Sequence, residues 1–299
     1  MYASEEAHYS VKRAVEILGF GSRGLRPVPT DGRHRLVPAA LAEAIDRDVQ
    51  EGATPVAVVA SAGTTLTGAI DPIAEIADEC APRSVWLHVD GAYGLPAAAV
   101  SRAAPCFAGV DRADSVTIDA HKWLYLPKAC GVVLVRDPET LVAAFAHEES
   151  YMPHEHGQLH AVDLTLEYSR PFRALKLWLA FRVHGARALR EAIERNLDQT
   201  ALLVREIGRH EDLELLIEPQ LSIVLFRHAP TDGRDTNAHN ARLAEELQAD
   251  GRVYVASATV DGGVWLRPCF VNYRTHDDDV RAFVEIVREL GAELGHPEP

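Results

Sequence analysis

The sequence predicts an α/β protein built on a mainly parallel β-sheet with helices on both faces. In the first half of the chain, short valine-rich apolar runs alternate with stretches of helical pattern. Strands that are apolar along their whole length are typical of parallel sheets, because helices cover both sheet faces. Later, shorter strand-like runs and helices predict a second unit. We therefore expect a large domain over residues 1–185 and a small C-terminal α/β domain over residues 186–299.

The elements of the large domain follow from local residue patterns. One helix is expected after Ser4, with Glu5 and Glu6 in an acidic first turn. Another is expected at Asp71 and Pro72, where Asp71 can cap the helix and Pro72 suits the first turn. The predicted buried strands, each bounded by Gly, Asp or Pro, are residues 55–60, 85–89, 115–118 and 131–135.

The second half begins with a polar, histidine-rich stretch over residues 147–167 that has no clear period. A stretch of this length without secondary structure is usually functional or disordered, and we expect a mobile loop. A long helix is predicted from about Phe172 towards His210. The strand-like runs after it are residues 213–217, 223–226, 253–255 and 264–267, with two helical stretches among and after them.

The composition excludes several classes of protein. The 299-residue chain has a net charge of −14, which argues against a surface for nucleic acid or for anionic membranes. No apolar run reaches membrane-spanning length, and the N-terminus does not resemble a signal peptide. The four cysteines form no C-x-x-C pair, so we expect reduced thiols in a cytoplasmic protein rather than a disulfide framework or a zinc ribbon.

Two segments carry the residues that are best suited to chemistry. Residues 86–94 (WLHVDGAYG) and residues 114–123 (DSVTIDAHKW) are each a buried-looking strand with charged residues at its end. Asp90 and Lys122 are 32 positions apart, about the length of one strand–helix–strand unit. Because ligands bind beyond the carboxyl ends of parallel strands, both side chains can reach one crevice.

An acid and a lysine placed in this way suit pyridoxal phosphate chemistry. A lysine amine can form a Schiff base with an aldehyde cofactor. A carboxylate that faces the pyridine nitrogen keeps the ring protonated, and the ring then withdraws electrons from the amino acid Cα. The same spacing is equally compatible with a plain ion pair between Asp90 and Lys122.

Longer motifs resemble the group II pyridoxal-phosphate-dependent decarboxylases, which include aromatic-L-amino-acid, histidine and glutamate decarboxylases. The pattern HVD-x-A-Y followed by HKW is highly specific to this family, and the resemblance covers nearly the whole chain. It implies fold type I, with a mainly parallel, seven-stranded type of sheet. The further segments that carry the resemblance are residues 4–10 (SEEAHYS), 63–65 (GTT) and 172–178 (FRALKLW).

The resemblance implies roles for individual residues. Lys122 binds the cofactor covalently, and Asp90 pairs with its ring nitrogen. His8 stacks on one face of the pyridine ring, and Ala92 packs on the other. Thr65 lies near the phenolic oxygen of the cofactor. Taken alone, His8 is also compatible with an ordinary first-turn histidine, and Thr65 with an ordinary turn residue.

Three further site residues come with the resemblance. Asp119 occupies a place near the cofactor phosphate where some relatives have Asn, and its charge would repel phosphate unless it points elsewhere. His121 either touches the cofactor or substrate, or only orients the strand end. Tyr151, in the expected mobile loop, returns a proton to Cα after carbon dioxide leaves. His154, His156 and His160 are close together in the same stretch, but a flexible loop without cysteine makes a poor zinc site, so we expect no metal.

The expected function is the pyridoxal-phosphate-dependent decarboxylation of an L-amino acid to its amine, in a homodimer that binds neither nucleic acid nor membranes. The alternatives are an aldehyde synthase or aminotransferase on the same fold, or a catalytically silent fragment. Family members usually carry more than a hundred residues before the segment that begins at Ser4, including a helix start that binds the phosphate. We therefore expect an N-terminally truncated chain that, alone, binds the cofactor weakly.

Overall fold

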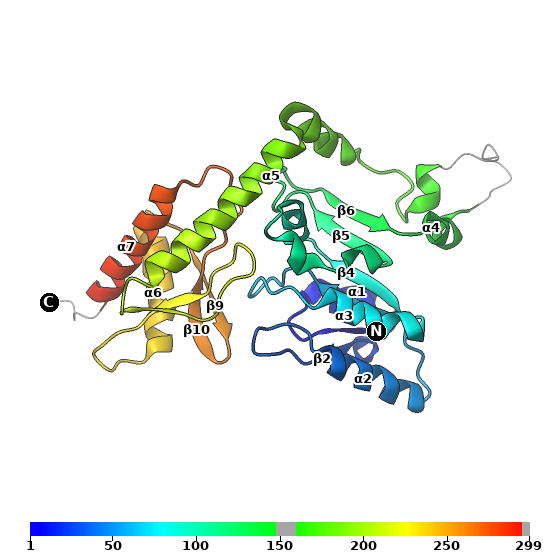
Figure 1. Cartoon of the computed structure of the whole chain (residues 1–299), viewed down its shortest axis with the longest axis horizontal. Coiled ribbons are helices and arrows are strands. Elements are labelled where there is room, and N and C mark those ends of the chain that lie inside the picture. The colour runs from blue at the N-terminus through cyan, green and yellow to red at the C-terminus, as the bar shows by residue number, and fades with distance from the viewer. Residues whose placement is uncertain (148–159, 295–299) are drawn as a thin grey trace.

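The computed structural model describes residues 1–147 and 160–294. Two sheets organise these residues, and Figure 1 shows them as separate bodies that are joined along one side by a long helix. The strands of the first sheet are β1 (Tyr2–Ser4), β2 (Arg26–Val28), β3 (Ala57–Ser61), β4 (Trp86–Asp90), β5 (Ser115–Asp119) and β6 (Gly131–Val135). The strands of the second sheet are β7 (Leu213–Leu215), β8 (Phe226–His228), β9 (Ala256–Val260) and β10 (Gly263–Arg267).

The helices connect and cover these strands. They are α1 (Tyr9–Ile17), α2 (Pro38–Gln50), α3 (Ile73–Cys80), α4 (Pro138–Phe145), α5 (Ala174–Ile207), α6 (Thr236–Asp250) and α7 (Asp277–Glu293). Short 3₁₀ turns lie between them at Ser22–Gly24, Ala81–Arg83, Leu95–Ala99, Ala104–Phe107, Val110–Arg112 and Ala161–Leu164. None of the described helices is long and apolar enough to cross a membrane.

The first sheet has the strand order β2-β1-β3-β4-β5-β6. The pairs from β2 to β5 are parallel, and only β6 runs antiparallel to its neighbour. The fold is therefore α/β with a mainly parallel sheet, as the sequence predicts. The described residues contribute six strands to this sheet, one fewer than the resemblance implies.

The core of the first unit forms where apolar helix faces meet the sheet. On α2, Leu41 and Ile45 stand four residues apart and are both fully buried. On α3, Ile73 and Ile76 stand three residues apart and are buried in the same cluster as Leu87 of β4. These spacings fix which face of each helix packs on the sheet.

The second unit is an antiparallel sheet covered by α6 and α7. Its strand order is β7-β8-β10-β9. On α7, Val280, Val284 and Val287 follow the helical spacing and are almost completely buried. Phe283 of the same helix packs edge-on against Phe226 of β8, with 5.7 Å between the ring centroids.

Helix α5 links the two units but is broken at Gly185, whose φ of 79° and ψ of 155° are not helical. Before the break, Trp178 and Val183 leave 58% and 72% of their surface exposed. After it, Ile193 and Leu203 are buried, the first in the core of the first unit and the second in that of the second unit. The C-terminal half of α5 is therefore the part that ties the two units together.

Two sequence predictions about helix starts are wrong. Helix α1 begins at Tyr9 rather than after Ser4, because Tyr2–Ser4 pairs with two strands and forms β1. Its first turn consequently contains no acidic residue. Asp71 does not cap α3, whose N-cap is Pro72. The buried carboxylate of Asp71 instead accepts hydrogen bonds from the backbone N–H groups of Leu36 and Ser61, both at 2.7 Å.

The predicted strands agree with the structure to within a few residues, with one clear exception. The run over residues 253–255 precedes the strand rather than forming it, since β9 spans Ala256–Val260 and pairs with β10. Val255 is buried in the second core, whereas β9 itself is largely exposed. The apolar run therefore marks a core contact, and the edge strand follows it.

Candidate active site

A cavity of about 500 Å³ opens at the carboxyl ends of the central parallel strands, between these ends and helix α1. The strands β3, β4 and β5 are neighbours in the sheet and run in the same direction, so their last residues meet at one edge. The residues of the cavity wall that belong to these ends and to α1 include Ser61, Asp90, Asp119, His8 and Val11.

Asp90 is the last residue of β4 and lies beside Thr117 of β5 in the strand register. Its Oδ1 atom accepts hydrogen bonds from the backbone N–H of Ala92 at 3.1 Å and from Thr117 Oγ1 at 3.4 Å. Both bonds hold one carboxylate oxygen against the strand end. The carboxyl group itself lines the cavity, which makes Asp90 an anionic group that is fixed in orientation.

A row of polar side chains continues behind Asp90 across the same face of the sheet. Ser115 Oγ accepts a hydrogen bond from Trp86 Nε1 at 2.8 Å and lies 2.8 Å from His88 Nδ1. His88 Nε2 lies 3.4 Å from Thr117 Oγ1, so the row reaches the partner of Asp90. Burial lowers the pKa of His88, which favours the neutral imidazole.

Sequence reasoning missed this row. No role is predicted above for His88, yet it lines the cavity together with Thr117. The available signal is the period of two along each strand: alternate positions 86, 88 and 90 face one way, as do 115, 117 and 119. Polar or aromatic residues at all six positions distinguish this face from the apolar one.

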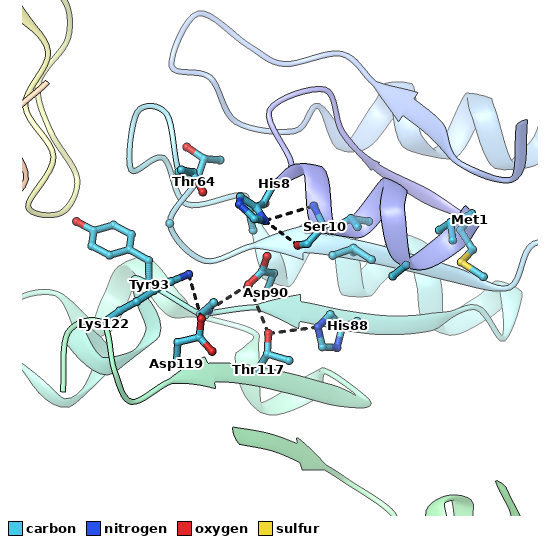
Figure 2. Close-up of a pocket in the computed structure, with 18 of the residues that line it drawn as sticks. Met1, His8, Ser10, Thr64, His88, Asp90, Tyr93, Thr117, Asp119 and Lys122 are labelled. Atoms are coloured by element: carbon cyan, nitrogen blue, oxygen red, sulfur yellow. Dashed lines mark hydrogen bonds and ion pairs between the residues drawn. The ribbon is translucent and has the colours of Figure 1, made fainter. Parts of the chain in front are cut away.

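Lys122 lies in the turn that follows β5 and lines the same cavity. Its Nζ atom forms an ion pair with Asp119 Oδ2 at 3.1 Å, and its backbone N–H donates to the carbonyl oxygen of Asp119 at 2.9 Å. Figure 2 shows Lys122 and Asp119 on one side of Asp90, below the end of α1. The structure thus brings the predicted acid and the predicted lysine to one cavity.

His121, the neighbour of Lys122, does not belong to the cavity wall. Its Nδ1 atom lies 3.2 Å from the backbone nitrogen of Cys130 and accepts that N–H. Its Nε2 atom lies 3.7 Å from Asp119 Oδ2. The ring therefore sits between the turn and the start of β6.

His8 is the N-cap of α1, and its Nδ1 atom accepts a hydrogen bond from the backbone N–H of Ser10 at 3.3 Å. Ser10 Oγ lies 2.7 Å from the same nitrogen. Both residues line the cavity, and Figure 2 shows His8 above the strand ends that carry Asp90 and Lys122. This N-cap bond fixes the imidazole of His8 at the N-terminus of α1.

Ala92 and Thr65 complete the predicted set around the cavity. The carbonyl oxygen of Ala92 accepts a hydrogen bond from the backbone N–H of Asp119 at 3.1 Å, which links the two strand ends. Thr65 is exposed, and its carbonyl oxygen accepts a hydrogen bond from the guanidinium of Arg267 in β10. The turn that carries Thr65 is thereby held by the second unit.

Tyr151, His154 and His156 lie outside the described residues. Within residues 1–147 and 160–294, no group of three His, Cys, Asp or Glu side chains is placed to hold a metal ion.

The groups around the cavity fit pyridoxal phosphate. An amine can bind an aldehyde, a carboxylate can pair with a protonated pyridine, and an imidazole can stack on the ring. A cavity of about 500 Å³ lies within the usual range for a cofactor site. Together with the parallel sheet, this donor set defines the class of pyridoxal-phosphate proteins with an α/β fold.

Comparison with known proteins assigns the family within that class. Residues 1–229 match the pyridoxal-dependent decarboxylase conserved domain, so the chain belongs to the pyridoxal-dependent decarboxylase family. The chain is 34% identical to an aromatic-L-amino-acid decarboxylase of Bacillus atrophaeus, over 98% of this chain and 63% of the relative. It is 35% identical to an L-2,4-diaminobutyrate decarboxylase of Rhizobium meliloti (strain 1021), over 97% of this chain and 59% of the relative.

A solved structure shows the same fold. The crystal structure of Oryza sativa TDC with PLP and tryptamine superposes with a TM-score of 0.92 at 28% identity, and the match covers 98% of this chain and 62% of that one. The chain therefore spans about three-fifths of the length of the proteins that it matches.

Proposed function

We propose that this chain forms the pocket of an enzyme that removes the carboxyl group of an L-amino acid as carbon dioxide, with pyridoxal phosphate as cofactor. The observation that carries the proposal is the convergence of Lys122, Asp90 and His8 on one cavity at the carboxyl ends of parallel strands. Membership of the decarboxylase family supports the reaction type.

Each residue of the central set has a distinct task in this proposal. Lys122 would supply the amine that holds the cofactor through its aldehyde. Asp90 would pair with the ring nitrogen and favour its protonated form, since an opposite charge stabilises the charged state. With the cofactor bound, the pocket holds an electron sink for the electrons of the broken carbon–carbon bond. Tyr151 returns a proton to Cα.

The surrounding residues hold the ring in place. We assign His8 and Ala92 to its two faces and Thr65 to the region of the phenolic oxygen, because all three line the cavity. We also assign Asp119 to the cofactor-binding set, since it lines the cavity and its carboxylate points to Lys122 in the chain without cofactor. The bond from the Cys130 backbone to His121 supports an orienting role for that ring.

We further propose a cytoplasmic homodimer that binds neither nucleic acid nor membranes. The net charge of −14 supports the absence of anionic partners, and all four cysteines are free thiols. The exposed Leu175, Leu179 and Val183, which follow one another at a spacing of four on the first half of α5, present an apolar face of the kind that associates. We also propose a domain boundary between residues 185 and 186, at the break in α5, with Ile193 beyond it still packed in the first core.

Reductive labelling tests the proposal. The chain is incubated with an excess of pyridoxal phosphate, reduced with borohydride and digested, and the labelled peptide is identified. We expect the label on Lys122, with Lys12, Lys128 and Lys176 as internal controls, since these four are the only lysines of the sequence. A Lys122→Ala variant should lose the label. A label on Lys128 or Lys176 in place of Lys122 would overturn the assignment, and an assay of amine and carbon dioxide tests the reaction type.

A further inference from the structure

The turn that carries Lys122 has an unusual backbone. Its hydrogen bonds run from the N–H of Lys122 to the carbonyl of Asp119 at 2.9 Å, and from the N–H of Tyr125 to the carbonyl of Lys122 at 3.2 Å. Tyr125 has a φ of 60°, a region that side chains other than glycine rarely adopt. Such a conformation persists only where surrounding contacts impose it.

Asn196 supplies the contacts that impose this conformation. Its Oδ1 atom accepts a hydrogen bond from the Tyr125 hydroxyl at 2.7 Å and another from Trp123 Nε1 at 3.1 Å. Trp123 is completely buried, and it follows Lys122 directly in the sequence. One amide oxygen on α5 therefore holds two side chains of the turn, on either side of Leu124.

The amide of Asn196 is fully used. Besides the two bonds that its oxygen accepts, its Nδ2 atom donates to Gln199 Oε1 at 2.9 Å and to the carbonyl oxygen of Asn272 at 3.1 Å. A carboxamide offers two acceptor and two donor positions, and all four are filled although the residue is 1% exposed. A buried amide adds nothing to packing that an apolar side chain could not supply, so the bonds themselves define its role.

The second strand end is tied to the same part of the chain. Tyr93, three residues after Asp90, stacks on Trp123 with 5.2 Å between ring centroids and 8° between planes. Its hydroxyl lies 2.6 Å from Ser222 Oγ and accepts the backbone N–H of Ser222 at 3.0 Å. The segments that follow Asp90 and Lys122 thus contact each other through the stack of Tyr93 on Trp123. Ser222 hydrogen-bonds to the first ring of this stack, and Asn196 hydrogen-bonds to the second.

We propose that Asn196 is a positioning residue for Lys122. Asn196 fixes the strained turn through its bonds to Trp123 and Tyr125. The fixed turn then keeps the Lys122 amine beside Asp119 in the cavity. That the placement of Lys122 matters for catalysis rests on the function proposed above. That Asn196 positions the turn of Lys122 does not depend on that function. Asn196 touches neither the cavity nor the amine, so its effect is indirect.

Amine labelling of the chain without cofactor tests the link. A small acylating reagent modifies the lysines, and peptide mapping gives the rate at Lys122 relative to Lys12, which lies on α1. In Tyr125→Phe and Asn196→Leu we expect this ratio to rise about threefold or more, because the released turn no longer holds the amine in its ion pair. Gln199→Met is the matched control, since it removes a partner of Asn196 Nδ2 but leaves both bonds to the turn.

The outcomes separate a positioning role from a purely structural one. The control should lower the melting temperature and leave the ratio unchanged. A ratio that stays at the wild-type value in Tyr125→Phe, or that rises equally in Gln199→Met, would overturn the proposal. Tyr125→Phe keeps the ring and its edge contact with Tyr273, so it decides the matter even if Asn196→Leu does not fold. Since no cofactor is present, failure here is distinct from failure of the reductive labelling.

Discussion

Lys122 Nζ lies 3.1 Å from Asp119 Oδ2, so the amine that we assign to cofactor binding is already paired with a carboxylate three residues before it. The two side chains are 39% and 26% exposed, which places the pair at the cavity surface rather than in the core. An exposed pair of this kind contributes at most about 1 kcal/mol, and salt screens it.

We predict that Asp119→Asn raises the acylation rate of Lys122 about threefold at low salt, because the neutral amide no longer holds the ammonium. Peptide mapping relative to Lys12 measures the change. The difference from wild type should shrink at 1 M salt, where the Debye length falls to about 3 Å. Asp111→Asn, an exposed carboxylate elsewhere, serves as the control. Equal rates in wild type and variant at low salt would contradict an ion pair in solution.

For Asp90→Asn we predict a loss of decarboxylation by roughly a hundredfold or more, with a smaller loss of cofactor affinity. The amide oxygen can keep the bonds from Ala92 and Thr117, so only the charge that favours the protonated ring is removed. Steady-state rates and cofactor titration by absorbance measure the two effects. Asp114→Asn is the control, since Asp114 accepts a bond from Leu87 at the opposite end of the same strands. Near-normal turnover would show that Asp90 does not face the ring nitrogen.

For Tyr151→Phe we predict that amine formation falls while an aldehyde product appears in the presence of oxygen. The reason lies in the family resemblance, in which members with Phe at this place tend toward oxidative deamination. Chromatography of both products, with ammonia as an independent measure, quantifies the shift. Tyr168→Phe, at a tyrosine just beyond the stretch 147–167, provides the control. A variant that forms amine at the wild-type rate would remove Tyr151 from the proton-return step.

The raised pKa of the buried Asp71 leads us to predict a pH dependence of the stability. Burial raises its pKa from 3.8 to about 6, against the opposing effect of the bonds from Leu36 and Ser61. The folded chain therefore binds more protons than the unfolded chain between these values, and the contribution of this group to stability falls as pH rises. We predict that wild type loses about 2 kcal/mol relative to Asp71→Asn between pH 4 and pH 7. Urea unfolding at several pH values measures the difference, and a constant gap would contradict the raised pKa.

A buried histidine pair predicts the opposite trend. His228 Nδ1 lies 3.0 Å from His239 Nε2, and burial lowers the pKa of both, that of His239 from 6.5 to about 4. Stability from this group is present at neutral pH and is lost as pH falls below about 6.5. We predict that wild type loses about 2 kcal/mol relative to His239→Gln between pH 7 and pH 5. The exposed His184→Gln is the control in urea unfolding, and it should follow wild type at each pH.

Sequence patterns located the elements that are long enough to show a period. The strands at Trp86–Asp90 and Ser115–Asp119 were predicted to within a residue or two, and with them the placement of Asp90 and Lys122. The three-residue β1 and β2 were not predicted, because three positions cannot display an alternation. The start of α1 was misplaced for the same reason, since β1 takes up Ser4.

The remaining differences depend on partners that are distant in the sequence. Asp71 has the local surroundings of a helix cap, but its partner Leu36 stands 35 positions away and no local pattern reports it. The bonds of Asn196 to Trp123 and Tyr125 are equally non-local. Local patterns therefore predicted where the chemistry lies, and tertiary contacts determined how it is held.

The stacked pair of Tyr93 and Trp123 has a consequence for how the chain is made. Ser222 stands 129 residues after Tyr93, and Asn196 stands 73 residues after Trp123. A ribosome releases the chain from its N-terminus, so the strand ends leave the exit tunnel well before the residues that brace them. Contacts across such separations close slowly. In the nascent chain, the turn of Lys122 therefore forms before Asn196 and Ser222 are available to hydrogen-bond to it and to Tyr93. The pocket can take the arrangement seen in the structure only after Ser222 has emerged.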